Sequence, residues 1–294
     1  MKLGACIPNY GETCSKEALV AIAAEAESCG YDSVWATDHI LMSKNSGTPY
    51  ERIFDSIATL SYLAGKTERV RLGISSLITP MRNPVIVAKQ LATIDNLSDG
   101  RLILATSVGW NETEFSNLGS NFHDRGRRLD ASIHLLRDLW SGKTSFENNK
   151  LPQHFHDAVF EPHPVQRKLT VWIGGTSPAA MRRAIREGDA WHPNLQPLDK
   201  FEKQVSDFRA LPSARGRDIC VRIGLNINAT KSEYLSPLGE KRIMLSSNQR
   251  ENSNILERLE SLGVKYAVVV PSPDGKVSVE DQAKGLQMIA REFM

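Results

Sequence analysis

The sequence predicts a (β/α)8 barrel, and three observations lead to this prediction. Short apolar segments of the length expected for buried strands alternate with helical patterns along the 294 residues. Two strands joined by a helix must run parallel, and eight such units are the number that closes a barrel. Residues 8–11, after the first strand, lack the Gly-x-Gly-x-x-Gly of dinucleotide-binding sheets, so an open doubly wound sheet is the second choice.

The clearest unit of this pattern is residues 70–115. Residues 70–77 are an apolar run rich in β-branched side chains, which is typical of a strand buried on both faces. Asn83 and Pro84 provide an N-cap and a first-turn proline for the helix that follows. After a Ser-Asp-Gly turn, residues 102–105 form the next strand. Polar residues follow both strands, at the end where α/β proteins place their chemistry.

The other elements are predicted from the same signals. Further strands are expected at residues 2–7, 33–36, 169–173, 189–191, 219–227 and 266–270. Further helices are expected at residues 15–28, 54–64, 129–140, 178–186, 198–211, 255–262 and 279–293. Residues 141–168 lack a sustained period and are interpreted as a short insertion before the fifth strand, with room for a hairpin. Residues 230–253 are polar and weakly patterned, and no linker divides the chain, so residues 1–294 are expected to form one domain.

Composition excludes several classes of function. The chain has 36 basic and 34 acidic residues, without the concentrated basic field that binds nucleic acid. The four cysteines are scattered and form no Cys-x-x-Cys pair, which argues against a zinc finger or a disulfide scaffold and favours reduced thiols. No signal-peptide pattern and no run of 18 apolar residues is present. We therefore expect a cytoplasmic protein that binds neither nucleic acid nor a membrane.

A glycine-rich turn follows the fifth predicted strand and opens a helix. It comprises Gly174, Gly175, Thr176 and Ser177, followed by Pro178. Glycines allow a ligand to approach the backbone, and free N–H groups at a helix N-terminus favour an anion. The turn is therefore either a phosphate-binding site or a tight strand-to-helix connection that needs glycine for its geometry alone.

Five further candidate residues lie at predicted strand ends, and two of them, Trp110 and Trp191, are expected to bind the substrate. Asp38 and His39 end the second strand, where His39 could transfer protons or Asp38 could merely cap a helix. Glu112, beside Trp110, could be a general acid or a charge that stabilises a helix N-terminus. Trp191 could wall a planar ligand or belong to the core.

Two histidines and an arginine cluster are weaker candidates. His154 and His156 alternate as metal ligands can, but they lie in the irregular insertion, so solvated histidines are the preferred interpretation. The arginines of residues 125–128 could anchor an anion or be solvated. Only His39 and His192 lie at strand ends, which argues against a metal-dependent barrel hydrolase, and no metal site is expected.

Taken in order, the motifs of the first two thirds of the chain resemble the luciferase-like monooxygenase superfamily, the (β/α)8 flavin and deazaflavin enzymes. The resemblance rests on Thr37-Asp38-His39, Arg82-Asn83-Pro84, Ala92-Thr93-Ile94-Asp95 with Ser98-Asp99-Gly100-Arg101, Gly109-Trp110-Asn111-Glu112, Arg125-Gly126-Arg127-Arg128, and Trp172-Ile173-Gly174-Gly175 with Gly188-Asp189-Ala190-Trp191.

The resemblance implies an oxidoreductase that binds FMN or coenzyme F420 at the carboxyl end of the barrel, usually as a homodimer, and acts on a small molecule. It assigns the phosphate to the turn at residues 174–177. It places Asp38 and His39 against the ring, where His39 would polarise or relay a proton and Asp38 would hold His39. It makes Glu112 an acid or a substrate ligand. It also implies a non-prolyl cis peptide at the end of the third strand, for which Ser75-Ser76 is our choice.

Three departures from the family pattern guide the choice of cofactor and substrate. Residues 105–109 read Ala-Thr-Ser-Val-Gly where many relatives have Gly-x-Gly-x-Gly. Residues 41–43 lack the tryptophan that some F420 sugar dehydrogenases carry, which argues against a sugar. The insertion at residues 141–168 is shorter than in alkanesulfonate-type enzymes, which favours F420. The alternatives are an FMN-dependent monooxygenase that uses FMNH2 and O2, and a non-catalytic flavin-binding protein.

Overall fold

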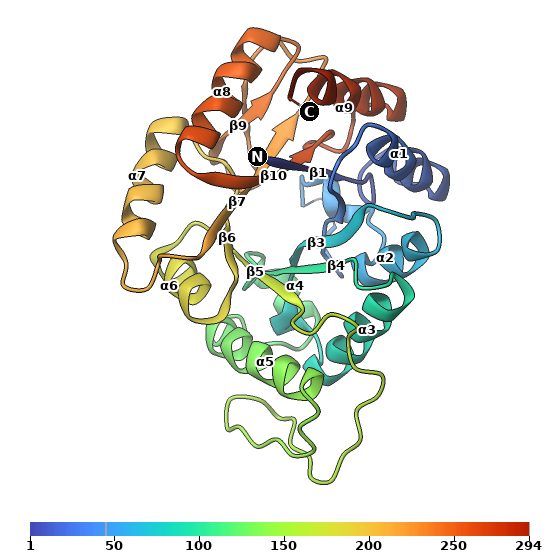
Figure 1. Ribbon diagram of the computed structural model, residues 1–294, viewed down its shortest axis with the longest axis vertical. Coiled ribbons are helices and arrows are strands. Elements are labelled where there is room, and N and C mark those ends of the chain that lie inside the picture. The colour runs from blue at the N-terminus through green and yellow to red at the C-terminus, as the bar shows by residue number, and fades with distance from the viewer. Residues whose placement is uncertain (45, 294) are drawn as a thin grey trace.

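A closed barrel of eight parallel strands is the centre of the computed structural model, which describes residues 1–44 and 46–293 (Figure 1). β10 pairs with β1 on one side and β7 on the other, and this closes the ring. The predicted (β/α)8 fold is therefore confirmed. The barrel strands are β1 (Lys2–Cys6), β2 (Ser33–Ala36), β3 (Arg71–Leu77), β4 (Leu102–Thr106), β5 (Thr170–Gly174), β6 (Ala190–His192), β7 (Asp218–Leu225) and β10 (Val264–Val270).

Helices surround this ring (Figure 1). Ser15, Asn83 and Ser177 accept backbone hydrogen bonds as N-caps, which confirms three of the predicted helix starts. Two 3-10 turns, η1 (Pro49–Glu51) and η2 (Thr79–Met81), follow β2 and β3. The helices are α1 (Lys16–Ser28), α2 (Ser56–Ala64), α3 (Pro84–Leu97), α4 (Glu112–Asn117), α5 (Arg125–Trp140), α6 (Pro178–Glu187), α7 (Leu198–Ala210), α8 (Gln249–Ser261) and α9 (Val279–Phe293).

The apolar core has two parts. A large cluster of aliphatic side chains fills the layer between strands and helices. A smaller cluster fills the barrel interior, where the rings of Trp35 and Trp172 stack with centroids 4.8 Å apart. Tyr266 meets both rings edge-on. This aromatic plug closes the barrel below its carboxyl end, so any ligand must lie above it.

The main difference from the sequence-based prediction is an antiparallel hairpin. β8 (Glu233–Leu235) and β9 (Lys241–Leu245) lie within residues 230–253, which were expected to be only weakly patterned. β9 also pairs in parallel with the carboxyl end of β7. Strands this short leave no clear period in the sequence, so local patterns do not predict them. Their position is set by the pairing of β9 with the carboxyl end of β7.

The insertion at residues 141–168 projects beyond α5 as an irregular loop (Figure 1). It contains an antiparallel bridge between Phe146 and Phe155, so the expected short hairpin is present. His154 and His156 lie in this loop, and the described residues contain no group of three or more side chains suited to a metal ion.

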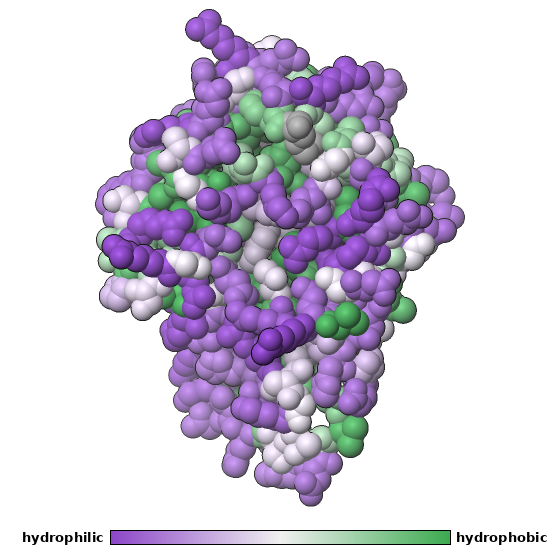
Figure 2. Space-filling view, in the orientation of Figure 1, coloured by the Kyte–Doolittle hydropathy of each residue, from purple (hydrophilic) through white to green (hydrophobic). Residues whose placement is uncertain are grey.

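Hydrophilic residues cover most of the face drawn in Figure 2, with hydrophobic residues in smaller groups between them. Within residues 1–44 and 46–293, no helix is both long enough and apolar enough to cross a membrane.

Replacing Gly73 with alanine tests the packing of the barrel interior. A Cβ at this position would lie 2.2 Å from the Trp35 ring, so we expect the Gly73→Ala variant to lose about 1–3 kcal/mol of unfolding free energy. Urea denaturation measures this loss. Gly65→Ala is the matched control, because its nearest atom lies 4.0 Å away. Equal stability of the two variants would contradict the tight packing described here.

Candidate active site

A cavity of about 230 Å³ opens at the carboxyl end of the barrel strands. It brings together residues from distant parts of the chain, including His39 after β2 and Gly174 at the end of β5. Most of the predicted site residues line it, which is the arrangement the sequence-based hypothesis requires. These residues are Asp38, His39, Ser75, Ser76, Trp110, Gly174, Gly175 and Thr176.

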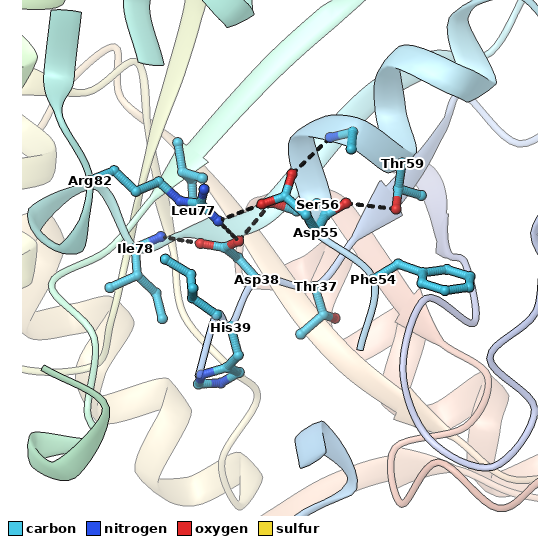
Figure 3. A network of polar contacts seen from close by, with 12 residues as sticks. Thr37, Asp38, His39, Phe54, Asp55, Ser56, Thr59, Leu77, Ile78 and Arg82 are labelled. Atoms are coloured by element: carbon cyan, nitrogen blue, oxygen red, sulfur yellow. Dashed lines mark hydrogen bonds and ion pairs between the residues drawn. The ribbon is translucent and has the colours of Figure 1, made fainter. Parts of the chain in front are cut away.

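The Asp38 carboxylate is fully buried and holds the loops around the cavity together. One oxygen accepts from Arg82 Nη2 and Ser56 Oγ at 2.7 Å each, and the other accepts from the Ile78 backbone N–H at 2.8 Å. Figure 3 shows this network on one side of Asp38 and the His39 ring on the other. Asp38 therefore does not hold His39, contrary to the expectation from their adjacency in the sequence.

The partner of His39 is Glu114, which the sequence analysis did not single out. His39 Nδ1 lies 2.7 Å from Glu114 Oε2, and Glu114 Oε1 accepts from the backbone N–H of Ile40 at 2.6 Å. Both side chains are almost completely buried. The His39 ring also stacks on Tyr50, with centroids 4.6 Å apart.

The charge state of Glu114 fixes the orientation of His39. Burial alone would raise the pKa of Glu114, but hydrogen bonds from His39 and from the Ile40 and Leu41 N–H groups outweigh it and lower that pKa. The carboxylate is therefore ionised and accepts a hydrogen bond from the Nδ1–H of His39. Nε2 remains as the His39 atom that can exchange a proton with a ligand in the cavity.

Glu112 lies outside this arrangement, although it is only two residues from Glu114. It lies in the first turn of α4, and its side chain is 64% exposed and reaches toward His123. Asn111 caps this helix. Glu112 is therefore a charge at a helix N-terminus, which is the alternative interpretation given in the sequence analysis. The position of Glu112 does not support the expected acid role.

The two tryptophans expected to bind substrate differ in their environment. Trp110 lines the cavity and meets His39 edge-on, with centroids 5.6 Å apart. Trp191 is fully buried on the outside of the barrel, where its ring stacks on Phe201 and Phe208 of α7. Trp191 is thus a core residue, and substrate contact is incompatible with its position. Side chains alternate across a strand, so neighbouring His192 faces the cavity instead.

The peptide bond between Ser75 and Ser76 is cis, as expected. His192 Nδ1 donates to the Cys220 carbonyl at 2.7 Å, so its Nε2 accepts from Ser75 Oγ at 2.8 Å. Burial is the main cause that lowers the pKa of His192, nearby Arg222 acts in the same direction, and the resulting pKa is about 4. A neutral His192 therefore fixes the Ser75 hydroxyl at the cavity wall.

The glycine-rich turn has the features of an anion cradle. Gly175 has a φ of 120°, which favours glycine, and its carbonyl accepts from Trp191 Nε1 at 2.7 Å. Ser177 caps α6, while the backbone N–H of Thr176 makes no hydrogen bond to a described residue. The turn thus leaves a backbone donor and the helix dipole for a ligand.

Arg222 of β7 and Arg242 of β9 also line the cavity, and the sequence analysis identified neither. Alternation along β7, in which Cys220 belongs to the interior cluster, could have placed Arg222 inside the barrel. Arg242 had no such signal, because its strand was not recognised.

The pH dependence of stability tests the neutral state of His192. Its pKa is about 4 in the folded protein against 6.5 for a free histidine, so only the unfolded chain takes up this proton between these pH values. Its contribution is complete above pH 6.5, and we expect about 2 kcal/mol to be lost between pH 7 and pH 5. Denaturant titrations of the wild type and of His192→Gln measure it. Parallel pH profiles for the two proteins would refute the prediction.

Comparisons with known proteins agree with this geometry. The family model described as luciferase-like monooxygenase matches residues 1–266. An FMNH2-dependent dimethylsulfone monooxygenase of Pseudomonas putida is 30% identical over 205 residues, covering 68% of this chain and 54% of the relative. An F420-dependent glucose-6-phosphate dehydrogenase of Tsukamurella paurometabola is 34% identical over 293 residues, covering 90% of this chain and 83% of the relative.

The structural comparison gives the same fold. An F420-dependent secondary alcohol dehydrogenase, solved with an F420-acetone adduct, superposes with a TM-score of 0.78 at 16% identity, covering 100% of this chain and 99% of the other. For several relatives in sequence, the matched region spans about half of the relative's length. The relatives include both F420-dependent dehydrogenases and FMNH2-dependent monooxygenases. This chain therefore belongs to the luciferase-like monooxygenase family of oxidoreductases.

Proposed function

We propose that this protein is an F420-dependent oxidoreductase that transfers a hydride between the deazaflavin and a small organic molecule. The observation that carries the proposal is the buried His39–Glu114 pair at the cavity wall, which presents one imidazole nitrogen for proton transfer. The choice of F420 over FMN rests on the share of this chain that the relatives match. Two F420-dependent relatives match 90% and 94% of this chain and two others match 59%, whereas two FMNH2-dependent relatives match 68%.

The residues present fit such a cofactor. The turn at residues 174–177 would hold the phosphate with its backbone donors and the α6 dipole. Ser75 and Ser76 would lie against the ring, together with the peptide backbone at Asp38. The bound cofactor supplies the hydride-transferring centre, and the protein supplies binding, orientation and charge.

His39 and Glu114 would manage the proton that accompanies hydride transfer. When a substrate alcohol is oxidised, its hydroxyl proton would pass to Nε2 of His39, and the ionised Glu114 would stabilise the resulting imidazolium. Trp110 would bound the substrate side of the same space, since it contacts the His39 ring.

The alternative is an FMN-dependent monooxygenase with the same fold. It is favoured by the similarity to the FMNH2-dependent dimethylsulfone monooxygenases of two Pseudomonas species. Both cofactors would use the same glycine-rich turn, so the affinities for F420 and for FMN must be measured to distinguish the two functions.

Titration of the purified protein with F420 and with FMN, followed by fluorescence, tests the proposal. We expect binding of F420 and much weaker binding of FMN. His39→Gln should lower F420-dependent turnover about 100-fold or more with little change in cofactor affinity, because general acid–base catalysis contributes about 10²–10⁴.

Glu114→Gln should also lower turnover and alter its pH profile, because the imidazolium loses its counter-charge. Glu112→Gln is the matched control and should behave as the wild type, since that side chain lies outside the cavity. Tight FMN binding without F420 binding would reject the F420 assignment, and a functional defect of Glu112→Gln would reject the role given to Glu114.

We further propose that the chain forms a homodimer. Tyr62 of α2 and Ile86 and Leu97 of α3 are large apolar side chains that are 37%, 56% and 61% exposed on two helices that pack together. Light scattering on the eluting protein should give twice the 32.7 kDa of one chain. A monomer at micromolar concentration would contradict the proposal.

A further inference from the structure

We propose that the substrate of this cavity carries an anionic group, such as a carboxylate or a phosphate, that binds between Arg222 and Arg242. The inference deepens the proposed function, because it assigns a substrate class to the same cavity. It rests on the hydrogen bonds and charges of the two arginines, and it depends on neither cofactor.

Arg222 is a cation inside the barrel with few partners. Its Nη2 donates to Thr37 Oγ1 at 2.8 Å, and the thiol of Cys6 is its other side-chain hydrogen-bond partner within the described part of the chain. Its Nε is buried and has no partner there, and no carboxylate among the described residues pairs with it. A guanidinium has five N–H donors and stays protonated, so most of its donors remain free.

The groups around Arg222 do not supply the missing negative charge. Cys6 and Tyr10 face it from β1 and the loop after β1, and Tyr50 and Tyr234 face it from η1 and β8. Burial raises the pKa of Cys6, of Tyr10 and of Tyr234, so these three groups stay protonated and uncharged. Removing an uncompensated cation from water is costly, and an anionic ligand would offset that cost.

Arg242 repeats this pattern at the mouth of the cavity. Its side chain is 14% exposed, its Nε is buried without a partner in the described chain, and its one acidic neighbour is Glu240 at 3.3 Å. Glu240 is 41% exposed, so solvent screens that ion pair. The β8–β9 hairpin places Arg242 beside the cavity that Arg222 lines from below.

The other charged groups near the cavity already have partners. Asp38 is neutralised by Arg82, and Glu114 is engaged by His39 and two backbone N–H groups. Arg242 has Glu240 beside it, so Arg222 is the charged group at the cavity that pairs with no group of opposite charge among the described residues. Planar guanidinium groups bind carboxylates and phosphates through paired hydrogen bonds, which explains why two arginines at one wall indicate an oxyanion.

A substrate anion fits these arginines better than the cofactor phosphate does. The glycine-rich turn after β5 has its own backbone donors for a phosphate, whereas Arg222 and Arg242 belong to β7 and β9, further along the sheet order. The cavity thus has two separate places that attract negative charge.

Calorimetric titration of the cofactor-free protein at constant ionic strength tests the inference. The probes are acetate and inorganic phosphate, and acetamide is the neutral analogue of acetate. We expect the anions to bind and acetamide to bind at least about tenfold more weakly, because it lacks the charge that the guanidinium groups recognise. Equal binding of acetate and acetamide would overturn the inference.

Arginine variants locate the bound anion. Arg222→Gln and Arg242→Gln should each weaken acetate binding about tenfold or more, whereas Arg258→Gln should not, because Arg258 pairs with Glu202 on the outer surface. Arg242 is at the mouth, so its variant retains the test if Arg222→Gln does not fold. Unchanged acetate and phosphate binding in both variants would place the anion at the glycine-rich turn and refute the inference.

Separate readouts distinguish this inference from the proposed function. Loss of F420 binding in both arginine variants, with acetate binding unchanged, would assign the arginines to the cofactor and overturn the inference. Wild-type protein that binds acetate through Arg222 and Arg242 but does not bind F420 would support the inference and refute the cofactor assignment. Arg222→Met should also raise the melting temperature of the ligand-free protein, because it removes a half-buried charge that has no carboxylate partner among the described residues. A lower melting temperature would contradict the description of Arg222 as uncompensated.

Discussion

Closure of the parallel ring is the constraint on which the rest of the structure depends. Because β10 hydrogen-bonds to both β1 and β7, every barrel strand ends at the same mouth. Residues far apart in the chain are thereby brought within hydrogen-bonding distance, as when Arg222 donates to Thr37, 185 positions earlier. The aromatic plug around Trp35 and Trp172 closes the interior below, so a ligand of the barrel would lie at this mouth.

Two buried carboxylates, Asp38 and Glu114, have different roles around that space. Asp38 is saturated by Arg82, Ser56 and the Ile78 N–H, and it fixes the loops after β2 and β3. Glu114 instead uses one oxygen to anchor the loop after β2 and the other to orient His39. Because both carboxylates are buried, these interactions are stronger than at a surface. Asp38 therefore holds the loops together, and Glu114 orients His39.

Neutral and cationic groups meet at the cavity floor. His192 stacks on Trp35 and remains uncharged, which lets it hold the Ser75 hydroxyl without adding charge. Arg222 lies on β7, the strand next to β6, and its guanidinium stays protonated. The floor therefore carries one fixed positive charge that pairs with no carboxylate among the described residues, and this charge is the basis of the anionic substrate proposed above.

The sequence by itself determined the barrel, its eight strands, most of its helices and the glycine-rich turn, because buried strands, helix caps and turns leave local signals. Tertiary structure decided which of two carboxylates on α4 is buried. Asn111 caps the helix either way, and only its packing against the loop after β2 selects Glu114 over Glu112. It also decided that Trp191 faces α7 and that Arg242 reaches the cavity on a hairpin. These outcomes depend on contacts between segments distant in the chain, and local patterns carry no information about such contacts.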